Sequence, residues 1–141
     1  MFLLDTNVIS ELRAGKPVQS LAVRRWAGSV PANRLYLSAI TVFELELGVL
    51  AMERKDPRQG LVLRSWLRGV LSGFSAQILP FSEATAVLCA AMHLPNRRAE
   101  RDAMIAASAR EHGYTVVTRN TADFLDCGVP LLDPWQTPEP A

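Results

Sequence analysis

Four acidic residues of this sequence lie where a cluster of carboxylates could do chemistry. They are Asp5, Glu44, Asp102 and Asp123. Carboxylates gathered in one cleft repel each other and raise each other's pKa values, so they stay ionised together only when cations neutralise them. Oxygen ligands without His or Cys favour Mg²⁺ or Mn²⁺ over zinc. One or two such ions can activate water for phosphodiester hydrolysis and stabilise the leaving oxygen.

Each acid also has a purely structural explanation when it is taken alone. Asp5 could cap the helix that follows it, and Asp102 could be a first-turn acid favoured by the helix dipole. Asp123 could be an ordinary turn residue. Glu44 could be a solvated helix residue, although helical geometry places it about 40° from Ile40 on the expected apolar arc, where a glutamate usually needs a partner.

The elements that must position these acids alternate between strand and helix. The strands are expected at residues 2–4, 35–37, 77–79, 115–118 and 130–132. The helices are expected at residues 6–13, 18–27, 38–52, 57–73, 84–92 and 102–112. Strands separated by helices predict an α/β fold with a parallel sheet covered on both faces. Ligands bind such sheets beyond the carboxyl ends of the strands, so the fold can bring all four acids to one edge.

Apolar spacing on two of these helices predicts how they pack. The helix at 38–52 should bury one face, which carries Ile40, Phe43, Leu47 and Leu50. The helix at 57–73 carries apolar residues on more than one face. We therefore expect a partner to cover part of that helix together with the helix around 18–26. The start of the first helix should be capped by Thr6 or Asn7.

Composition is that of one globular domain. The chain has 141 residues, of which 49% are hydrophobic and 21% charged, with a formal net charge of +1. This balance excludes wholesale disorder, and no apolar run approaches the roughly 20 residues of a membrane span. Cys89 and Cys127 lie far apart without the paired spacing of a zinc site. We expect a cytoplasmic protein whose mature form starts at Met1.

Four sequence motifs occur in an order that resembles the PIN-domain family. They are FLLDTNVISE at 2–11, SAITVFELELG at 38–48, RDAMIAA at 101–107 and VTRNTADF at 117–124. Each motif is weak alone, but four in order at these spacings are specific. The sequence is similar in particular to toxin–antitoxin ribonucleases of the VapC and FitB type, over residues 1 to about 134.

This resemblance implies a fold, a site and an activity. The fold would be a PIN domain over 1–134, with a central parallel sheet of about five strands flanked by helices, followed by a flexible tail at 135–141. By position, the acids named above match the family's acidic quartet, which binds Mg²⁺ or Mn²⁺. The supporting polar residues near the metal would be Thr6, Asn7, Thr118 and Asn120. The implied activity is endonucleolytic cleavage of RNA.

The resemblance also implies partners. Proteins of this kind usually dimerise and are held inactive by a small antitoxin. The antitoxin typically binds DNA as well. We therefore expect a cognate antitoxin, an RNA substrate, a homodimer or a toxin–antitoxin hetero-oligomer, contact with operator DNA only through the antitoxin, and no membrane association. Candidate RNA contacts are Arg97, Arg98 and Arg101, although a solvated loop beside Glu100 is the slightly favoured explanation.

Other functional classes fit less well. A haloacid dehalogenase phosphatase needs a second Asp two residues after the first, but position 7 is Asn. A receiver domain needs a Lys after a late strand, and the lysines here are the early Lys16 and Lys55. The serious alternative is a catalytically inactive PIN-fold binding module. For Trp26, Trp66 and Trp135, packing is favoured over base stacking.

Overall fold

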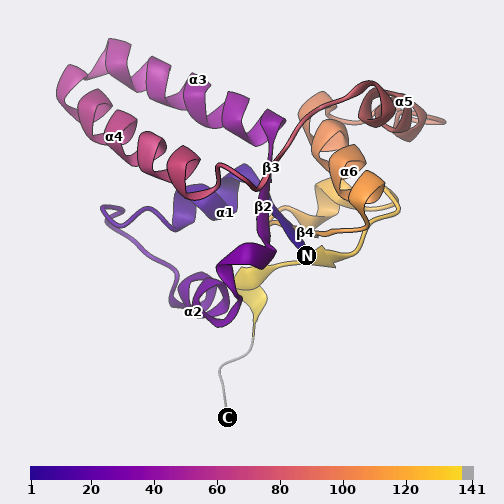
Figure 1. Cartoon of the computed structure of the whole chain (residues 1–141), viewed down its shortest axis with the longest axis horizontal. Coiled ribbons are helices and arrows are strands. Elements are labelled where there is room, and N and C mark those ends of the chain that lie inside the picture. Colours follow the sequence, from indigo (N-terminus) through magenta and orange to yellow (C-terminus); the bar gives the residue numbers. More distant parts are fainter. Residues whose placement is uncertain (138–141) are drawn as a thin grey trace.

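The computed structural model describes residues 1–137, which form a central sheet with helices on both sides (Figure 1). The strands are β1 (Phe2–Leu4), β2 (Leu35–Ser38), β3 (Ile78–Leu79), β4 (Thr115–Val117) and β5 (Leu131–Leu132). The α-helices are α1 (Thr6–Glu11), α2 (Leu21–Ser29), α3 (Ala39–Lys55), α4 (Pro57–Gly73), α5 (Glu83–Met92) and α6 (Glu100–His112). Three 3₁₀ helices are η1 (Ala32–Arg34), η2 (Thr121–Phe124) and η3 (Pro134–Gln136). Within the described residues, no helix is both long and apolar enough to cross a bilayer.

All five strands run parallel, in the order β3-β2-β1-β4-β5. The central strand β1 pairs Phe2 with Leu35 of β2 on one side and with Thr115 of β4 on the other. Parallel neighbours need long crossover connections, which the helices supply. The predicted five-stranded parallel sheet flanked by helices is confirmed, and its carboxyl ends lie along one edge.

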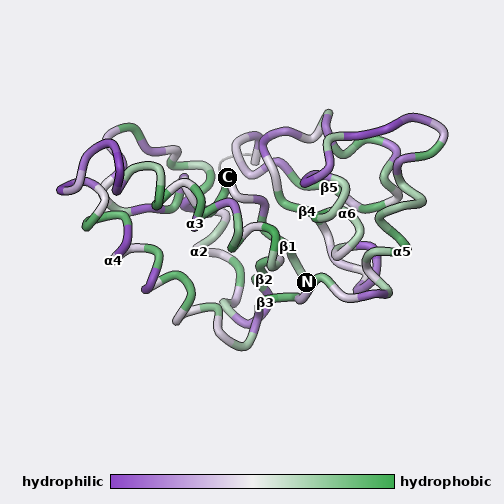
Figure 2. Tube along the Cα trace, turned by 90° about the horizontal axis from the view of Figure 1, so that it is seen from above, coloured by the Kyte–Doolittle hydropathy of each residue, from purple (hydrophilic) through white to green (hydrophobic). Residues whose placement is uncertain are grey.

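Successive strand residues point into two separate hydrophobic cores. Leu3 and Val116 face the core that α5 and α6 complete. The next residues along the same strands, Leu4 and Val117, face the core formed with α1, α2, α3 and α4. Hydrophobic residues accordingly follow the central strands in Figure 2. Burial on both faces fixes the strands, and with them the residues at their carboxyl ends.

Serine caps determine where two helices begin. Ser38 is buried at the end of β2 and accepts a hydrogen bond from the Thr41 backbone N–H at 3.1 Å, so α3 begins at the predicted place. Ser20 accepts from the Val23 N–H at 3.3 Å. For that reason α2 begins at Leu21, three residues later than predicted.

Helices α3 and α4 form a hairpin that extends away from the sheet (Figure 1). Gly60 permits the close approach, because a Cβ at this position would lie 2.6 Å from the Glu53 Cα. Arg64 of α4 adds ion pairs to Glu46 and, at 2.9 Å, to Glu53 of α3. The hairpin is therefore held by both backbone contact and charge.

The prediction of the buried face of α3 is wrong for most of its residues. The side chains that enter the core are Leu45 and Val49, whereas Phe43, Leu47 and Leu50 are 55%, 47% and 48% exposed. The helix is apolar around much of its circumference, so its own periodicity does not select the face that packs. The sheet and α4 take the Leu45 side, which leaves an exposed apolar stripe of Phe43, Leu47 and Leu50.

Helix α4, by contrast, turns most of its apolar residues inward. Leu67 is fully buried, and Leu63, Trp66, Val70 and Leu71 pack against the same core. Exposed apolar side chains remain at Leu61 and Val62 of α4 and at Leu21 of α2. The wide apolar distribution on α4 is therefore explained largely by packing within this chain.

The chain stays packed beyond the predicted domain boundary at residue 134. Trp135 lies in η3, packs against the core that contains Trp26, and has its backbone N–H bonded to the Asp133 carboxylate at 2.9 Å. The predicted tail at 135–141 therefore begins too early, because the Trp135 ring has a core to pack against. Residues 138–141 of that predicted tail lie outside the described residues.

Candidate active site

Three of the four predicted acids line one cavity of about 480 Å³ at the carboxyl edge of the sheet. Asp5 directly follows β1, Glu44 lies in the second turn of α3, and Asp102 lies in the first turn of α6. Asp123, in η2, is exposed and outside the lining, but its charge still raises the pKa values of Asp5 and Asp102. The structure thus brings three acids together and places the fourth beside them.

Asp5 is buried and held by three donors. Its Oδ1 accepts from the Thr6 backbone N–H at 2.8 Å, so Asp5 is the N-cap of α1 in place of the predicted Thr6 or Asn7. Its Oδ2 accepts from the Thr118 hydroxyl at 2.8 Å and from the Asn7 amide at 3.4 Å. Burial raises the pKa of Asp5, the Thr118 and Thr6 hydrogen bonds partly offset this rise, and neighbouring carboxylates add to it.

Thr118 connects the polar residues at the end of β4. It is fully buried, and its hydroxyl oxygen accepts from the Asn120 backbone N–H at 3.0 Å and from the Asn7 amide at 3.4 Å. The structure therefore places all four predicted supporting residues, Thr6 included, within the network around Asp5. This network fixes the direction in which the Asp5 carboxylate points.

Glu44, which was expected to need a partner on the apolar side of α3, accepts a hydrogen bond from Thr6. The Thr6 hydroxyl donates to Glu44 Oε1 at 2.7 Å, and Arg101 Nη1 lies 3.5 Å from Oε2. Thr6 thus connects two acids of the cluster, since its backbone N–H binds Asp5 while its hydroxyl binds Glu44.

Asp102 is the least satisfied acid of the cluster. It is half-buried, and its carboxylate makes no hydrogen bond or ion pair with any residue in the described part of the chain. Burial and repulsion by Asp5, Asp123 and Glu44 raise its pKa to about 6, against a smaller opposing effect of Arg101. A carboxylate in these surroundings is poised to accept a cation.

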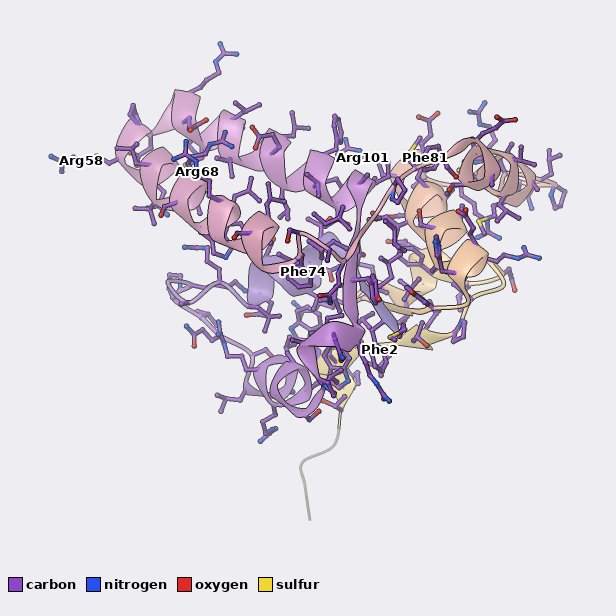
Figure 3. All side chains as sticks on the ribbon, viewed as in Figure 1. Phe2, Arg58, Arg68, Phe74, Phe81 and Arg101 are labelled. Atoms are coloured by element: carbon purple, nitrogen blue, oxygen red, sulfur yellow. The ribbon has the colours of Figure 1, made fainter. Side chains whose placement is uncertain are left out.

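The three arginines predicted as RNA contacts lie in different surroundings. Arg101 lies between α3 and α6 (Figure 3), with its guanidinium 5.5 Å from the centre of the Phe43 ring. Arg98 donates to the backbone carbonyls of Met92 and Leu125, so it ties two loops together. Arg97 is exposed and lies 3.5 Å from Glu100. Of the three, only Arg101 is adjacent to the acids.

Sequence reasoning missed several residues that line the same cavity. They are Ser10, Glu11, Lys16, Arg119 and Trp135. A signal existed for Arg119, since it stands between the two predicted polar residues Thr118 and Asn120. No local signal existed for Lys16, which reaches the cavity from the loop after α1. Trp135 was assigned to packing, and it does pack, but it also lines the cavity.

The donor chemistry fits a hard, hydrated divalent cation. Within residues 1–137, no three His, Cys, Asp or Glu side chains are close enough together to hold one metal ion at once. Mg²⁺ commonly keeps several water ligands and takes only one or two carboxylates from the protein. The carboxylates of Asp5, Glu44 and Asp102 on the lining, which contains no Cys or His, meet that requirement and disfavour zinc.

Comparison with known proteins gives consistent matches over nearly the whole chain. The sequence profile described as PIN domain matches residues 2–127. Toxin FitB of Neisseria gonorrhoeae is 36% identical over 140 residues, covering 96% of this chain and 99% of that protein. VapC ribonuclease Y4jK of Sinorhizobium fredii is 38% identical over 142 residues, with coverage of 96% and 99%. A solved structure of FitAB bound to an IR36 DNA fragment matches with a TM-score of 0.88 at 36% identity, covering 99% of each chain.

Proposed function

Because this chain belongs to the PIN-domain family, we propose that it is a metal-dependent endoribonuclease that acts as the toxin of a toxin–antitoxin pair. The names of two relatives, one a toxin and one a ribonuclease, support this proposal. Both relatives align over 96% of the chain.

The observation that carries the proposal is the half-buried Asp102 carboxylate, which has a raised pKa and no side-chain partner in the described part of the chain. A half-buried carboxylate without a hydrogen-bond donor is unfavourable, and repulsion from other carboxylates adds to that penalty. Helix capping explains Asp5, and the Thr6 hydroxyl explains part of Glu44. Asp102 does lie in the first turn of α6, where the helix dipole favours an acid. Its carboxylate nevertheless has no side-chain partner among residues 1–137, and its surroundings raise its pKa to about 6. Binding of a cation is the function that accounts for it.

The chain's own residues have separate roles in this proposal. Asp5, Glu44 and Asp102 would hold Mg²⁺ or Mn²⁺, with one or two of them as direct ligands and the rest acting through its bound water. Asp123 would add negative charge from the side. The bound cation supplies Lewis-acid activation of water and neutralises charge on the phosphodiester. Thr118 orients Asp5 through its 2.8 Å hydrogen bond. Thr6 orients Glu44 in the same way, so the carboxylates are directed before the cation and the RNA arrive.

A cleavage assay with a matched pair of variants tests the proposal. A short fluorescent single-stranded RNA is incubated with the protein in Mg²⁺, in Mn²⁺ and in EDTA. We expect cleavage only with metal, and its loss in Asp102→Asn. Glu100→Gln removes an exposed carboxylate from the same helical turn, outside the cavity, and should cleave like the wild type. Cleavage in EDTA, or by Asp102→Asn at the wild-type rate, would contradict the proposal.

Calorimetric titration with Mn²⁺ separates the enzyme from an inactive binding module. An active site predicts Mn²⁺ binding that weakens in Asp102→Asn but not in Glu100→Gln. A protein that binds no Mn²⁺ and cleaves no RNA would instead be the inactive PIN-fold module.

Two partners are part of the proposed function: a second copy of this chain and a cognate antitoxin. The exposed stripe of Phe43, Leu47 and Leu50 on α3 supports the dimer, because it lies beside a cavity of about 650 Å³ lined by Ile40, Phe43 and Met104 among others. Contiguous exposed apolar surface of this kind marks interaction sites. Contact with operator DNA would come through the antitoxin, and the solved structure of FitAB bound to a DNA fragment supports a complex of this kind.

Light scattering with charge variants tests the dimer. Leu47→Lys lies in the α3 stripe and should convert the dimer to a monomer. Leu61→Lys introduces the same charge at an exposed position of α4 and should leave the mass unchanged. A wild-type protein that stays monomeric at tens of micromolar would refute the dimer.

A further inference from the structure

The cavity that holds the acids is also lined by basic and aromatic side chains. Its lining includes Lys16, Arg119 and Trp135 as well as the acids. One cavity therefore presents the carboxylates of Asp5, Glu44 and Asp102 together with two cations and an aromatic ring, and its fourth carboxylate, Glu11, is paired with Lys16. Its volume of about 480 Å³ lies within the range of small-molecule and cofactor sites.

Arg119 carries the unpaired positive charge among these basic and aromatic lining residues. It directly follows the polar end of β4, and its backbone N–H donates to Asn7 Oδ1 at 3.4 Å, which places it beside the acid network. Its side chain is exposed and forms no ion pair with any acid in residues 1–137. A guanidinium with unused donors, close to a proposed phosphate-cleaving centre, is suited to a second phosphate.

Lys16 adds hydrogen-bond donors more than charge. Its ammonium lies 2.9 Å from Glu11 Oε1, and Glu11 is only 5% exposed. This ion pair neutralises most of the charge of Lys16. The ammonium has three N–H donors, so two remain for an anion in the cavity.

Trp135 supplies an aromatic surface beside Arg119. The Arg119 guanidinium carbon lies 5.1 Å from the centre of the Trp135 ring, which is the geometry of a cation–π contact. Trp135 is held in place by the Asp133 hydrogen bond and by packing on the core. Aromatic rings and guanidinium planes are the surfaces on which single-stranded bases stack.

We propose that Lys16, Arg119 and Trp135 form a nucleotide subsite of this cavity. Arg119, assisted by Lys16, binds the phosphate next to the one held at the acids, and the attached base stacks on the Arg119–Trp135 pair. The subsite rests on the proposed function, because it takes the scissile phosphate to lie at the acids. It gives the site a preference for RNA that continues past the cleaved bond.

Fluorescence anisotropy in EDTA tests the subsite without any cleavage. The probe is a short, labelled, single-stranded RNA. Arg119→Gln should weaken its binding about tenfold and reduce the slope of log affinity against log salt by about 0.7. The control is Arg58→Gln, which removes the same charge from an exposed side chain at the far tip of the α3–α4 hairpin (Figure 3). The control should bind within twofold of the wild type.

Tryptophan fluorescence tests the stacking part separately. RNA should quench the wild-type emission, and Trp135→Phe should abolish most of the quenching. Trp26→Phe replaces a core ring that packs edge-on against Phe2 and should retain the quenching. Thermal melting of both variants verifies that they remain folded.

The possible results distinguish the subsite from the catalytic proposal. Equal binding by Arg119→Gln and Arg58→Gln would overturn the subsite even if the wild type cleaves RNA with metal. Loss of RNA binding in Arg119→Gln alone supports the subsite even if no cleavage is found. If Arg119→Gln keeps RNA binding but loses binding of an acidic peptide, Arg119 serves a protein partner and the subsite is wrong.

Discussion

Replacing Asp102 by Asn should stabilise the metal-free protein at neutral pH. The folded state raises the pKa of Asp102 from 3.8 to about 6, so the folded chain holds this proton more tightly than the unfolded chain does. Between these two pH values the folded state binds more protons, and stability therefore falls as the pH rises. Above pH 6 the full penalty of the ionised carboxylate remains. Asp102→Asn removes that penalty.

The size of the gain follows from the same pKa. At about 1.4 kcal/mol for each pH unit, the rise sets a ceiling of about 3 kcal/mol on the penalty. The carboxylate is only half-buried, and solvent screening reduces the effect. We therefore expect Asp102→Asn to raise the free energy of unfolding by about 1 to 2 kcal/mol at pH 7.5. At pH 4.5 the gain should fall to about a third of that value.

Urea unfolding in EDTA, followed by tryptophan fluorescence at both pH values, measures this difference. Glu100→Gln is the control, and it should stay within about 0.5 kcal/mol of the wild type at each pH. Excess Mn²⁺ should make the wild type more stable than Asp102→Asn at pH 7.5, since metal binding raises the free energy of unfolding of the wild type more than that of the variant. A variant that is less stable than the wild type at pH 7.5, or whose gain does not depend on pH, would refute the electrostatic reasoning.

Three further predictions concern other positions. Gly60→Ala should destabilise the protein by about 1 to 3 kcal/mol in thermal melting, because the new Cβ meets the Glu53 backbone; Gly69→Ala, which has open space, should be neutral or slightly stabilising. Asp5→Asn should abolish metal-dependent cleavage while circular dichroism shows an intact fold, since the Asn oxygen can still cap α1. Arg101→Gln should shift the pH midpoint of Mn²⁺ binding upward, because Arg101 lowers the pKa of Asp102; an unchanged midpoint would exclude this role.

Features that depend on neighbouring residues could be predicted from the sequence. Ser38 caps α3 because a serine after an apolar strand offers an oxygen to the next N–H groups. Gly113 ends α6 with φ of 72°, a conformation that favours glycine. The alternation of such signals with short apolar runs is what predicted the parallel sheet and located Asp5 at its carboxyl edge.

Features that depend on distant contacts could not be predicted in the same way. Lys16 reaches the cavity only because the loop after α1 folds back to pair with Glu11. Trp135 was predicted to lie in a flexible tail, because the sequence does not show that its ring packs against the core beside Trp26. On α3, periodicity showed an apolar helix but not which side the sheet and α4 would cover. In each case the deciding partner lies far away in the sequence.

The acids of this cavity differ in whether they also stabilise the folded chain. Asp5 contributes to folding as a helix cap, and Glu44 accepts a hydrogen bond, so removing either acid would disturb local structure as well as charge. Asp102 contributes no such contact, and the nearby Arg101 is half-exposed and lies 3.5 Å from Glu44. Lys16 and Arg119 line the same cavity, but no cation among the described residues pairs with Asp102. Asp102 lowers the stability of the metal-free protein and makes no stabilising side-chain contact within residues 1–137 in exchange. Such a residue is expected where a bound cation removes the electrostatic penalty.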